Sequence, residues 1–318
     1  MSLKEEFVIM NKKTLFAGVA ALIASAGFAE AKTVCYVTAA DSHAYVTPAN
    51  KAIDARAKEL GVEVLSLSQN FDVQTGVQQI NTCIARKAAG IILWPLDPQA
   101  YIPGLAKAKA AGIPVNLINS PMNDAAKPFV TSFTGPDVYS EGEMAAEALQ
   151  KALDGKGSIV IIAGQAGNGT TIGRVDGFNA KLKALGSKIE VLDTVNADFD
   201  QQKALVASRD LITRFGDKIA GVYANDDTMA RGFIDAWKEA KSGKATPPIV
   251  GINGQKDAFE SIRNGEMYAT IVQSPIEDGL LAINAMADVL NGKKIDARLP
   301  IPLTVVTKAN VEKEKPAF

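Results

Sequence analysis

Residues 33–67, TVCYVTAADSHAYVTPANKAIDARAKELGVEVLSL, contain one complete strand–helix–strand unit, and this unit decides the fold. Thr33–Ala39 is a continuous run of the kind found in strands that are buried on both faces of a sheet. Pro48–Leu60 has helical spacing and stops at Gly61, a usual helix terminator, and Val62–Leu67 is the next strand. This order predicts a parallel sheet with right-handed crossovers.

The same alternation continues along the chain in two series. We expect strands at 90–94, 113–118, 158–163, 190–194, 221–224, 248–252 and 268–273, helices at 73–87, 100–111, 137–153, 174–184, 201–215, 228–242, 258–264 and 277–291, and an extended tail at 302–307. Gly135-Pro136 interrupts the pattern between the series. The 318 residues therefore predict an α/β protein of two similar doubly wound halves.

The N-terminus has the composition of a secretory signal peptide. Lys12 and Lys13 precede an apolar run, Leu15–Phe28, which ends at Ala29-Glu30-Ala31. A buried helix or a membrane anchor are the alternatives, although the run is short for a bilayer span. We expect cleavage near Ala31, a periplasmic location and no membrane insertion afterwards. Residues 1–9 precede a second methionine, Met10, and are either an over-long start or an added segment.

Composition excludes several classes of function. The chain is 47% hydrophobic and 22% charged with a net charge of −1, which gives no electrostatic footprint for nucleic acid. One histidine and two cysteines argue against a transition-metal site, and we expect no cofactor. Cys35 and Cys83 form a disulfide or remain buried free thiols. The predicted topology favours the disulfide, because it brings both residues to the bottom of the first sheet, far from the strand ends that bind ligands.

Two motifs raise the question of catalysis. Gly164–Gly173 follows a strand, but it lacks the Gly-Lys-Ser/Thr ending of a phosphate loop and the spacing of a dinucleotide site. We expect a flexible loop that delivers Arg174 to the cleft. Asp226-Asp227 lies between a strand and a helix, where capping is the favoured role for one carboxylate. With one histidine, His43, and no G-x-S-x-G motif, the sequence argues against an enzyme.

Polar and aromatic residues instead gather after the predicted strands, where open parallel sheets bind ligands. The candidates in the first half are His43, Tyr45, Trp94, Asn119 and Ser120, and those in the second half are Arg174, Phe199, Asn225, Asn253 and Gln273. Sugars need this mixture of planar apolar faces and groups that pair hydroxyls. Each residue alone could stabilise only a turn, so the interpretation depends on their convergence. Trp94 offers either a second stacking face or a core side chain.

Four segments carry a resemblance to a known family: Ala197–Asp200, Tyr223–Ala230, Val250–Gly254 and Ala269–Gln273. They resemble ribose-binding-protein-like sugar receptors, the type I periplasmic binding proteins of ABC importers. The resemblance covers the chain from the first strand to the tail. It implies two lobes joined by a three-segment hinge, with crossovers near Thr134–Asp137, Asn253–Gln255 and Pro302–Thr304. The expected N-terminal lobe is 32–135, with 254–302 as an alternative assignment, and the C-terminal lobe is 136–253 plus 303–318.

The resemblance also implies a set of ligand contacts. The family positions that touch the sugar correspond to Arg174, Phe199, Asn225 and Gln273, which are intact here. The chain departs from the ribose-type pattern at other positions, namely His43, Tyr45-Val46, Asn119-Ser120 and Asn253. Two carboxylates and one guanidinium of that pattern are thus replaced by neutral groups, and amides donate as well as accept. We therefore expect a ligand that is not simply ribose.

The sequence thus predicts a receptor that captures a small neutral sugar or polyol and delivers it to the permease subunits of an ABC importer. One alternative is a sensory receptor that presents a sugar-like signal to a membrane kinase or chemoreceptor. Another is the effector domain of a transcription repressor, which would need a helix-turn-helix where the predicted signal peptide lies.

Overall fold

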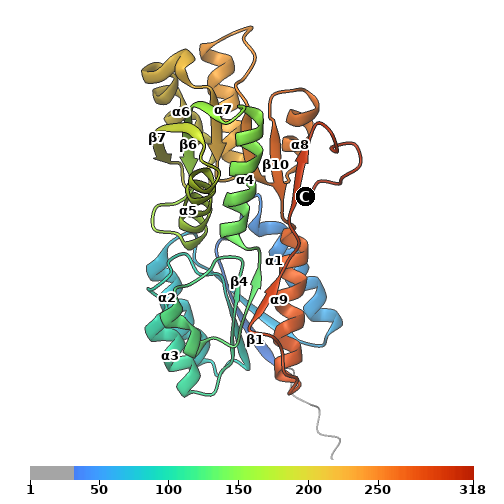
Figure 1. Ribbon diagram of the computed structural model, residues 1–318. Helices are drawn as coiled ribbons and strands as arrows, with labels where there is room; N and C mark the ends of the chain where they lie inside the picture. The colour runs from blue at the N-terminus through green and yellow to red at the C-terminus, as the bar shows by residue number, and fades with distance from the viewer. Residues whose placement is uncertain (1–31) are drawn as a thin grey trace, which may run out of the picture. The chain divides into compact units, whose positions relative to one another are not determined.

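The computed structural model describes residues 32–318, which belong to one compact unit built on two sheets (Figure 1). The predicted signal peptide, which ends at Ala31, and the over-long start at 1–9 lie outside the described residues. Within residues 32–318, no helix is both long enough and apolar enough to cross a bilayer.

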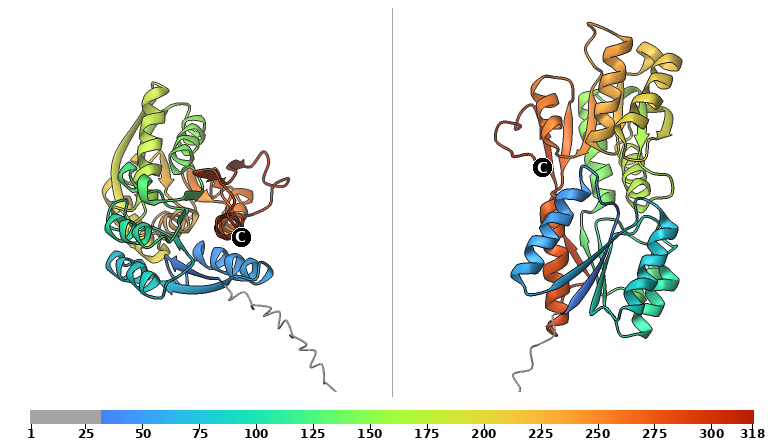
Figure 2. Two further views of the ribbon diagram at one scale, coloured as in Figure 1. Left: turned by 90° about the horizontal axis from the view of Figure 1, so that it is seen from below. Right: turned by 180° about the vertical axis from the view of Figure 1, so that it is seen from behind.

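The first sheet has six parallel strands in the order β11-β5-β4-β3-β1-β2. The strands are β1 (Thr33–Thr38), β2 (Glu63–Ser68), β3 (Gly90–Leu93), β4 (Val115–Ile118), β5 (Ser132–Gly135) and β11 (Arg298–Pro300). Every residue of β3 and β4 is buried, as expected for strands covered on both faces. Helices α1 (Val46–Glu59) and α9 (Pro275–Leu290) cover one face, and α2 (Val73–Ala85) and α3 (Ile102–Ala110) cover the other (Figures 1 and 2).

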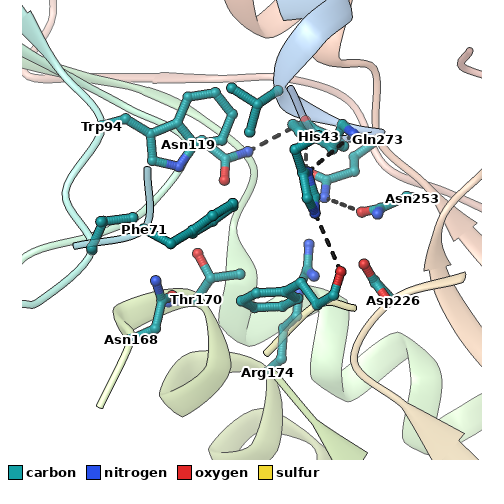
Figure 3. A pocket seen from close by; sticks show the side chains of 14 residues that line it. His43, Phe71, Trp94, Asn119, Asn168, Thr170, Arg174, Asp226, Asn253 and Gln273 are labelled. Carbon is teal, nitrogen blue, oxygen red and sulfur yellow. Dashed lines mark hydrogen bonds between the residues drawn. The ribbon is translucent and has the colours of Figure 1, made fainter. Parts of the chain in front are cut away.

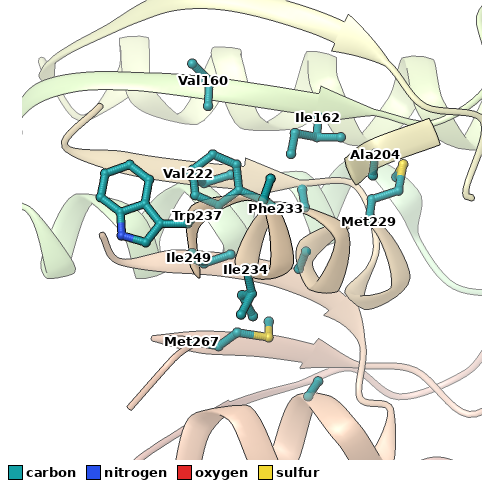
Figure 4. Packing of buried hydrophobic residues seen from close by; sticks show 14 of the residues in the cluster. Val160, Ile162, Ala204, Val222, Met229, Phe233, Ile234, Trp237, Ile249 and Met267 are labelled. Atoms are coloured by element: carbon teal, nitrogen blue, oxygen red, sulfur yellow. The ribbon is translucent and has the colours of Figure 1, made fainter. Parts of the chain in front are cut away.

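The second sheet has the order β12-β10-β9-β8-β6-β7 and is parallel except for its edge strand β12. Its strands are β6 (Lys156–Ala163), β7 (Lys188–Asn196), β8 (Gly221–Ala224), β9 (Ile249–Asn253), β10 (Ala269–Val272) and β12 (Thr304–Thr307). Its helices are α4 (Val138–Ala152), α5 (Gly169–Ala184), α6 (Gln201–Phe215), α7 (Asp227–Ala240) and α8 (Lys256–Arg263). Phe233 and Trp237 on α7 pack onto Val222 and Ile249 of the sheet in its larger core (Figure 4).

We call the first sheet with α1–α3 and α9 the first lobe, and the second sheet with α4–α8 the second lobe. The chain passes between them after β5, after β10 and between β11 and β12. The crossover expected near Asn253–Gln255 is wrong, because β10 pairs with β9 and the chain leaves the second sheet only after Val272. For the same reason residues 254–272 belong to the second lobe, and the alternative assignment of 254–302 to the first lobe is correct only for its later part.

Some short elements differ from the predicted pattern. Strands β5 and β11, of four and three residues, and the 3-10 helix η1 (Asp124–Phe129) were not predicted, since segments this short give little periodicity. Helix α5 begins at Gly169 because the Asn168 side chain caps it, accepting a hydrogen bond from the backbone N–H of Thr170 at 2.9 Å. The second half of Gly164–Gly173 is therefore helix and not a flexible loop.

Cys35 on β1 and Cys83 on α2 form a disulfide with their Cα atoms 5.8 Å apart. Both side chains are fully buried in the core between the first sheet and the layer of α2 and α3. Of the two alternatives left open by the sequence, the structure has the bonded one.

We expect this disulfide to stabilise the fold, because it closes a loop with a sequence separation of 48 residues. The chain-entropy relation gives about 4 kcal/mol for such a loop. Urea unfolding with and without a reducing agent should therefore show a lower free energy of unfolding after reduction. In the Cys35→Ala/Cys83→Ala control, the reducing agent should have no effect. Equal stability of the oxidised and reduced wild-type protein would contradict this expectation.

Candidate binding site between the two sheets

A cavity lies at the carboxyl ends of both sheets (Figure 3). Its wall from the first lobe consists of His43, Tyr45, Val46, Phe71, Trp94, Leu96 and Asn119. The second lobe contributes Asn168, Thr170, Arg174, Phe199, Asp226, Asn253 and Gln273. These residues end a strand, follow one or open the next helix, apart from Arg174 in the second turn of α5, and strand ends are where parallel sheets bind ligands. The cavity therefore has the position of a ligand site.

Aromatic rings and one amide shape the first-lobe wall. The Tyr45 and Trp94 rings meet edge to face with their centroids 6.0 Å apart. Trp94 packs into the first-lobe core, one of its two predicted roles, and it also lines the cavity, where its role as a stacking face stays a prediction. The Asn119 Nδ2 atom donates to Asp278 Oδ2 at 3.0 Å and to the Tyr45 hydroxyl at 3.3 Å. Burial raises the pKa of Asp278 to about 8.

The second-lobe wall is built around a buried ion pair. Arg174 Nε donates to Glu141 Oε2 at 2.7 Å, and a terminal nitrogen of Arg174 donates to the carbonyl of Asn225 at 2.7 Å. Both side chains of the pair are almost completely buried. Burial raises the pKa of Glu141, and the guanidinium beside it opposes that rise. The positive charge of Arg174 is therefore compensated within the protein, before any ligand is considered.

Gln273 connects this ion pair to the first lobe. Its amide suits its neighbours with Oε1 toward Arg174, where it accepts a hydrogen bond at 2.5 Å. In that orientation Nε2 donates to Glu141 Oε1 at 3.2 Å and to the Tyr45 hydroxyl at 3.0 Å. The Asn253 amide lies 2.8 Å away. A fixed polar network therefore runs across one wall of the cavity, from the second lobe to the first.

Two polar atoms on consecutive residues after β8 have no hydrogen-bond partner among the described residues. Asn225 Oδ1 accepts from the backbone N–H of Gly164, and Asp226 Oδ1 caps α7 by accepting from that of Met229. The other atoms, Asn225 Nδ2 and Asp226 Oδ2, are buried without a hydrogen-bond partner among the described residues. Burial raises the pKa of Asp226 to about 6. Asp226 lines the cavity, so its unpaired oxygen can accept a hydrogen bond from a ligand hydroxyl.

The structure brings most of the predicted site residues together. His43, Tyr45, Trp94, Asn119, Arg174, Phe199, Asn253 and Gln273 line the cavity. Ser120 and Asn225 do not line it. The Ser120 hydroxyl accepts from the Thr170 hydroxyl at 2.9 Å across the two lobes, and Asn225 is fully buried beside Asp226.

Four polar or aromatic wall residues were not predicted: Phe71, Asn168, Thr170 and Asp226. Phe71 follows the second strand and shares its Phe-Asp sequence with Phe199, which was a usable signal. Asp226 was interpreted as a helix cap, which it is, but capping occupies only one of its oxygens. Among residues 32–318, no group of three or more His, Cys, Asp or Glu side chains could hold a metal ion.

Comparisons with known proteins identify the family of this chain. Residues 34–294 match the family described as "Periplasmic binding protein domain". The chain is 31% identical to the xylitol-binding protein of Mycolicibacterium smegmatis over 87% of its length and 77% of the relative. It is 30% identical to the ribose import binding protein of Bacillus subtilis over 81% of each chain.

A solved structure extends the likeness to three dimensions. The ABC transporter solute-binding protein of Agrobacterium vitis with bound D-fucose superposes with a TM-score of 0.82 and 26% identity, over 88% of this chain and 97% of that one. Each of these three proteins is named as a binding protein and not as an enzyme. The chain therefore belongs to the periplasmic binding protein family.

Proposed function

We propose that this protein captures a small neutral sugar or polyol between its lobes and delivers it to the permease subunits of an ABC importer. The unpaired oxygen Asp226 Oδ2 carries the proposal, because Asp226 lines the cavity and this oxygen can accept a hydrogen bond from a ligand hydroxyl. Phe71, Trp94 and Phe199 on the same walls supply apolar surfaces for the C–H face of such a molecule.

The charges of the site favour a ligand without charge. Glu141 already compensates Arg174, so an anionic ligand would find no free cation in the described part of this cavity. Neutral His43, whose pKa burial lowers, adds no positive charge near pH 7. Bringing a phosphate or carboxylate into a buried site without a partner is costly. The remaining wall groups, mainly amides and hydroxyls, suit the hydroxyls of a neutral polyol.

The relatives support this class of ligand and the transport role. Those named above are designated for xylitol or ribose, or carry bound D-fucose, and two are named for import or for an ABC transporter. Export fits the signal-peptide pattern that ends at Ala31. Cleavage there would release the protein into the periplasm, where such receptors meet their importers.

A ligand screen tests the class of ligand. In thermal unfolding, at least one of xylitol, D-ribose, D-fucose and myo-inositol should raise the melting temperature. A ligand at a hundred times its Kd stabilises the native state by about 2.7 kcal/mol. Gluconate and ribose 5-phosphate are charged controls and should give no shift. A response to the charged compounds alone would contradict the proposal.

Asp226→Asn tests the open acceptor. Asparagine still caps α7 but presents an amide in place of the free carboxylate oxygen, so we expect at least a tenfold weaker affinity for the best ligand. Arg174→Ala is a poorer test, because it would leave Glu141 buried without its partner and cost roughly 3–5 kcal/mol of stability. The exposed Asp176→Asn on α5 is the matched control. Calorimetric affinities equal to wild type would remove Asp226 from the site.

The same carboxylate predicts a pH dependence. If the ionised form of Asp226 accepts the ligand hydroxyl, binding lowers its pKa below the unliganded value of about 6. Affinity should therefore be full above pH 6 and fall by up to about tenfold per pH unit below it. In affinity titrations from pH 7.5 to 5, the Asp226→Asn variant should not show this loss of affinity at low pH. If the variant lost affinity at low pH as the wild type does, the pH dependence would belong to another group, such as His43.

Gly169→Ala tests the approach of the lobes. A Cβ atom on Gly169 at the start of α5 would lie 2.4 Å from the carbonyl oxygen of Pro121 in the first lobe. Alanine is a good helix former, so the melting temperature without ligand should not fall. The methyl group should hold the lobes apart and weaken the affinity about tenfold or more. Wild-type affinity would show that this close approach is not needed for binding.

A further inference from the structure

The same turn occurs at the carboxyl end of an edge strand in each sheet. After β2, Asn70 and Phe71 have φ values of 48° and 57°, and after β7, Asp198 and Phe199 have values of 53° and 58°. Left-handed backbone is uncommon for residues other than glycine, above all for a bulky one. In both turns the next residue is an aspartate that caps a helix: Asp72 accepts from Thr75 N at 2.6 Å, and Asp200 accepts from Lys203 N at 2.8 Å. The same unusual turn thus occurs once in each lobe.

Both turns direct their phenylalanine to the cavity. Phe71 and Phe199 line it from opposite lobes, and the rings of His43 and Phe71 are arranged edge to face with their centroids 5.2 Å apart. Phe71 therefore adds an aromatic ring to the first-lobe wall of the cavity (Figure 3).

The backbone carbonyls of the same two residues receive hydrogen bonds from the opposite lobe. Gln165 Nε2 in the second lobe donates to the Phe71 carbonyl at 3.3 Å. His43 Nε2 in the first lobe lies 3.3 Å from the Phe199 carbonyl. The backbone N–H of Tyr45 donates to His43 Nδ1, so the neutral ring carries its proton on Nε2 and donates to Phe199. Each lobe thus donates one hydrogen bond to a backbone carbonyl of the other lobe and accepts one in return.

The Gln165 side chain is not in a position to contact a ligand in the cavity. It does not line the cavity, and its Oε1 atom is buried without a hydrogen-bond partner among the described residues. A buried unpaired amide oxygen is costly and calls for an explanation. The only hydrogen bond of this side chain within residues 32–318 is the one that crosses the lobes to Phe71.

We propose that two hydrogen bonds hold the lobes closed, one from Gln165 to the Phe71 carbonyl and one from His43 to the Phe199 carbonyl. We call this pair of bonds the latch, and Gln165 and His43 are its positioning residues. Phe71 and Phe199 each present a ring to the ligand and a carbonyl to the opposite lobe. Ligand contact and lobe closure are therefore made by the same two residues, and a ligand that orders the rings also orders the latch. Its role in ligand retention rests on the proposed function, whereas its role in closure does not.

Closure can be measured without any ligand. The hydroxyl oxygens of Ser120 and Thr170 lie 2.9 Å apart across the lobes, so a Ser120→Cys/Thr170→Cys pair places two sulfur atoms within bonding reach only when the lobes are closed. Adding Gln165→Ala to this reporter should slow disulfide formation roughly threefold to tenfold, the worth of one hydrogen bond. Adding Gln202→Ala, an exposed glutamine on α6, is the matched control and should leave the rate unchanged. Equal rates in the Gln165→Ala and control backgrounds would overturn the latch.

Dissociation kinetics test the link to the ligand. The tightest of xylitol, D-ribose, D-fucose and myo-inositol should leave Gln165→Ala and the isosteric Gln165→Glu at least threefold faster than wild type. Glutamate has the shape of glutamine but no proton to donate near pH 7. Wild-type dissociation rates in both variants would overturn the proposed role in ligand retention. If the wild-type protein bound none of these probes, the proposed function would fail, and the cross-linking rates would still decide the latch.

Discussion

The buried ion pair between Arg174 and Glu141 is the interaction on which the site depends. It joins α5 to α4, and the two helices can bring it together only because their backbones almost touch. A Cβ atom on Gly142 would lie 2.1 Å from the Arg174 carbonyl oxygen. Any larger residue there would separate the helices and withdraw the guanidinium from its partners. The close approach of two helices thus sets the position of the central charged group.

A buried charge pair is tolerated only when its remaining donors and acceptors are also paired. Arg174 meets this condition through the Asn225 carbonyl and the Gln273 amide, and Glu141 meets it through the same amide. These bonds fix the orientation of the Gln273 amide, so the polar groups on this wall are in place before a ligand arrives. Such preorganisation lowers the entropy lost on binding. The ion pair therefore holds the neighbouring wall groups in fixed positions, and it adds no net charge to the site.

The fold and much of the site follow from the sequence because parallel sheets impose strict rules. Alternating strands and helices predict the two sheets, and the strand-end rule places His43, Tyr45, Arg174 and Gln273 around one cavity. The same rule could not tell a side chain on the wall from one just behind it, as Asn225 shows. Lobe membership after Asn253 was also beyond reach. It depends on which sheet β10 joins, and its sequence would suit either sheet.

The contacts between the lobes divide into two groups with different consequences. Tyr45 and Gln273 meet directly beside the crossover after β10, so a rotation about the crossovers would move them little. The hydrogen bonds of Gln165, His43 and Thr170 to the opposite lobe come from loops and helix starts outside the crossovers, where the same rotation produces larger displacements. Each is a single hydrogen bond, worth only about 1 kcal/mol net. The second group is therefore weak enough to break without a ligand, and a bound polyol that touches both lobes adds to contacts that are individually marginal.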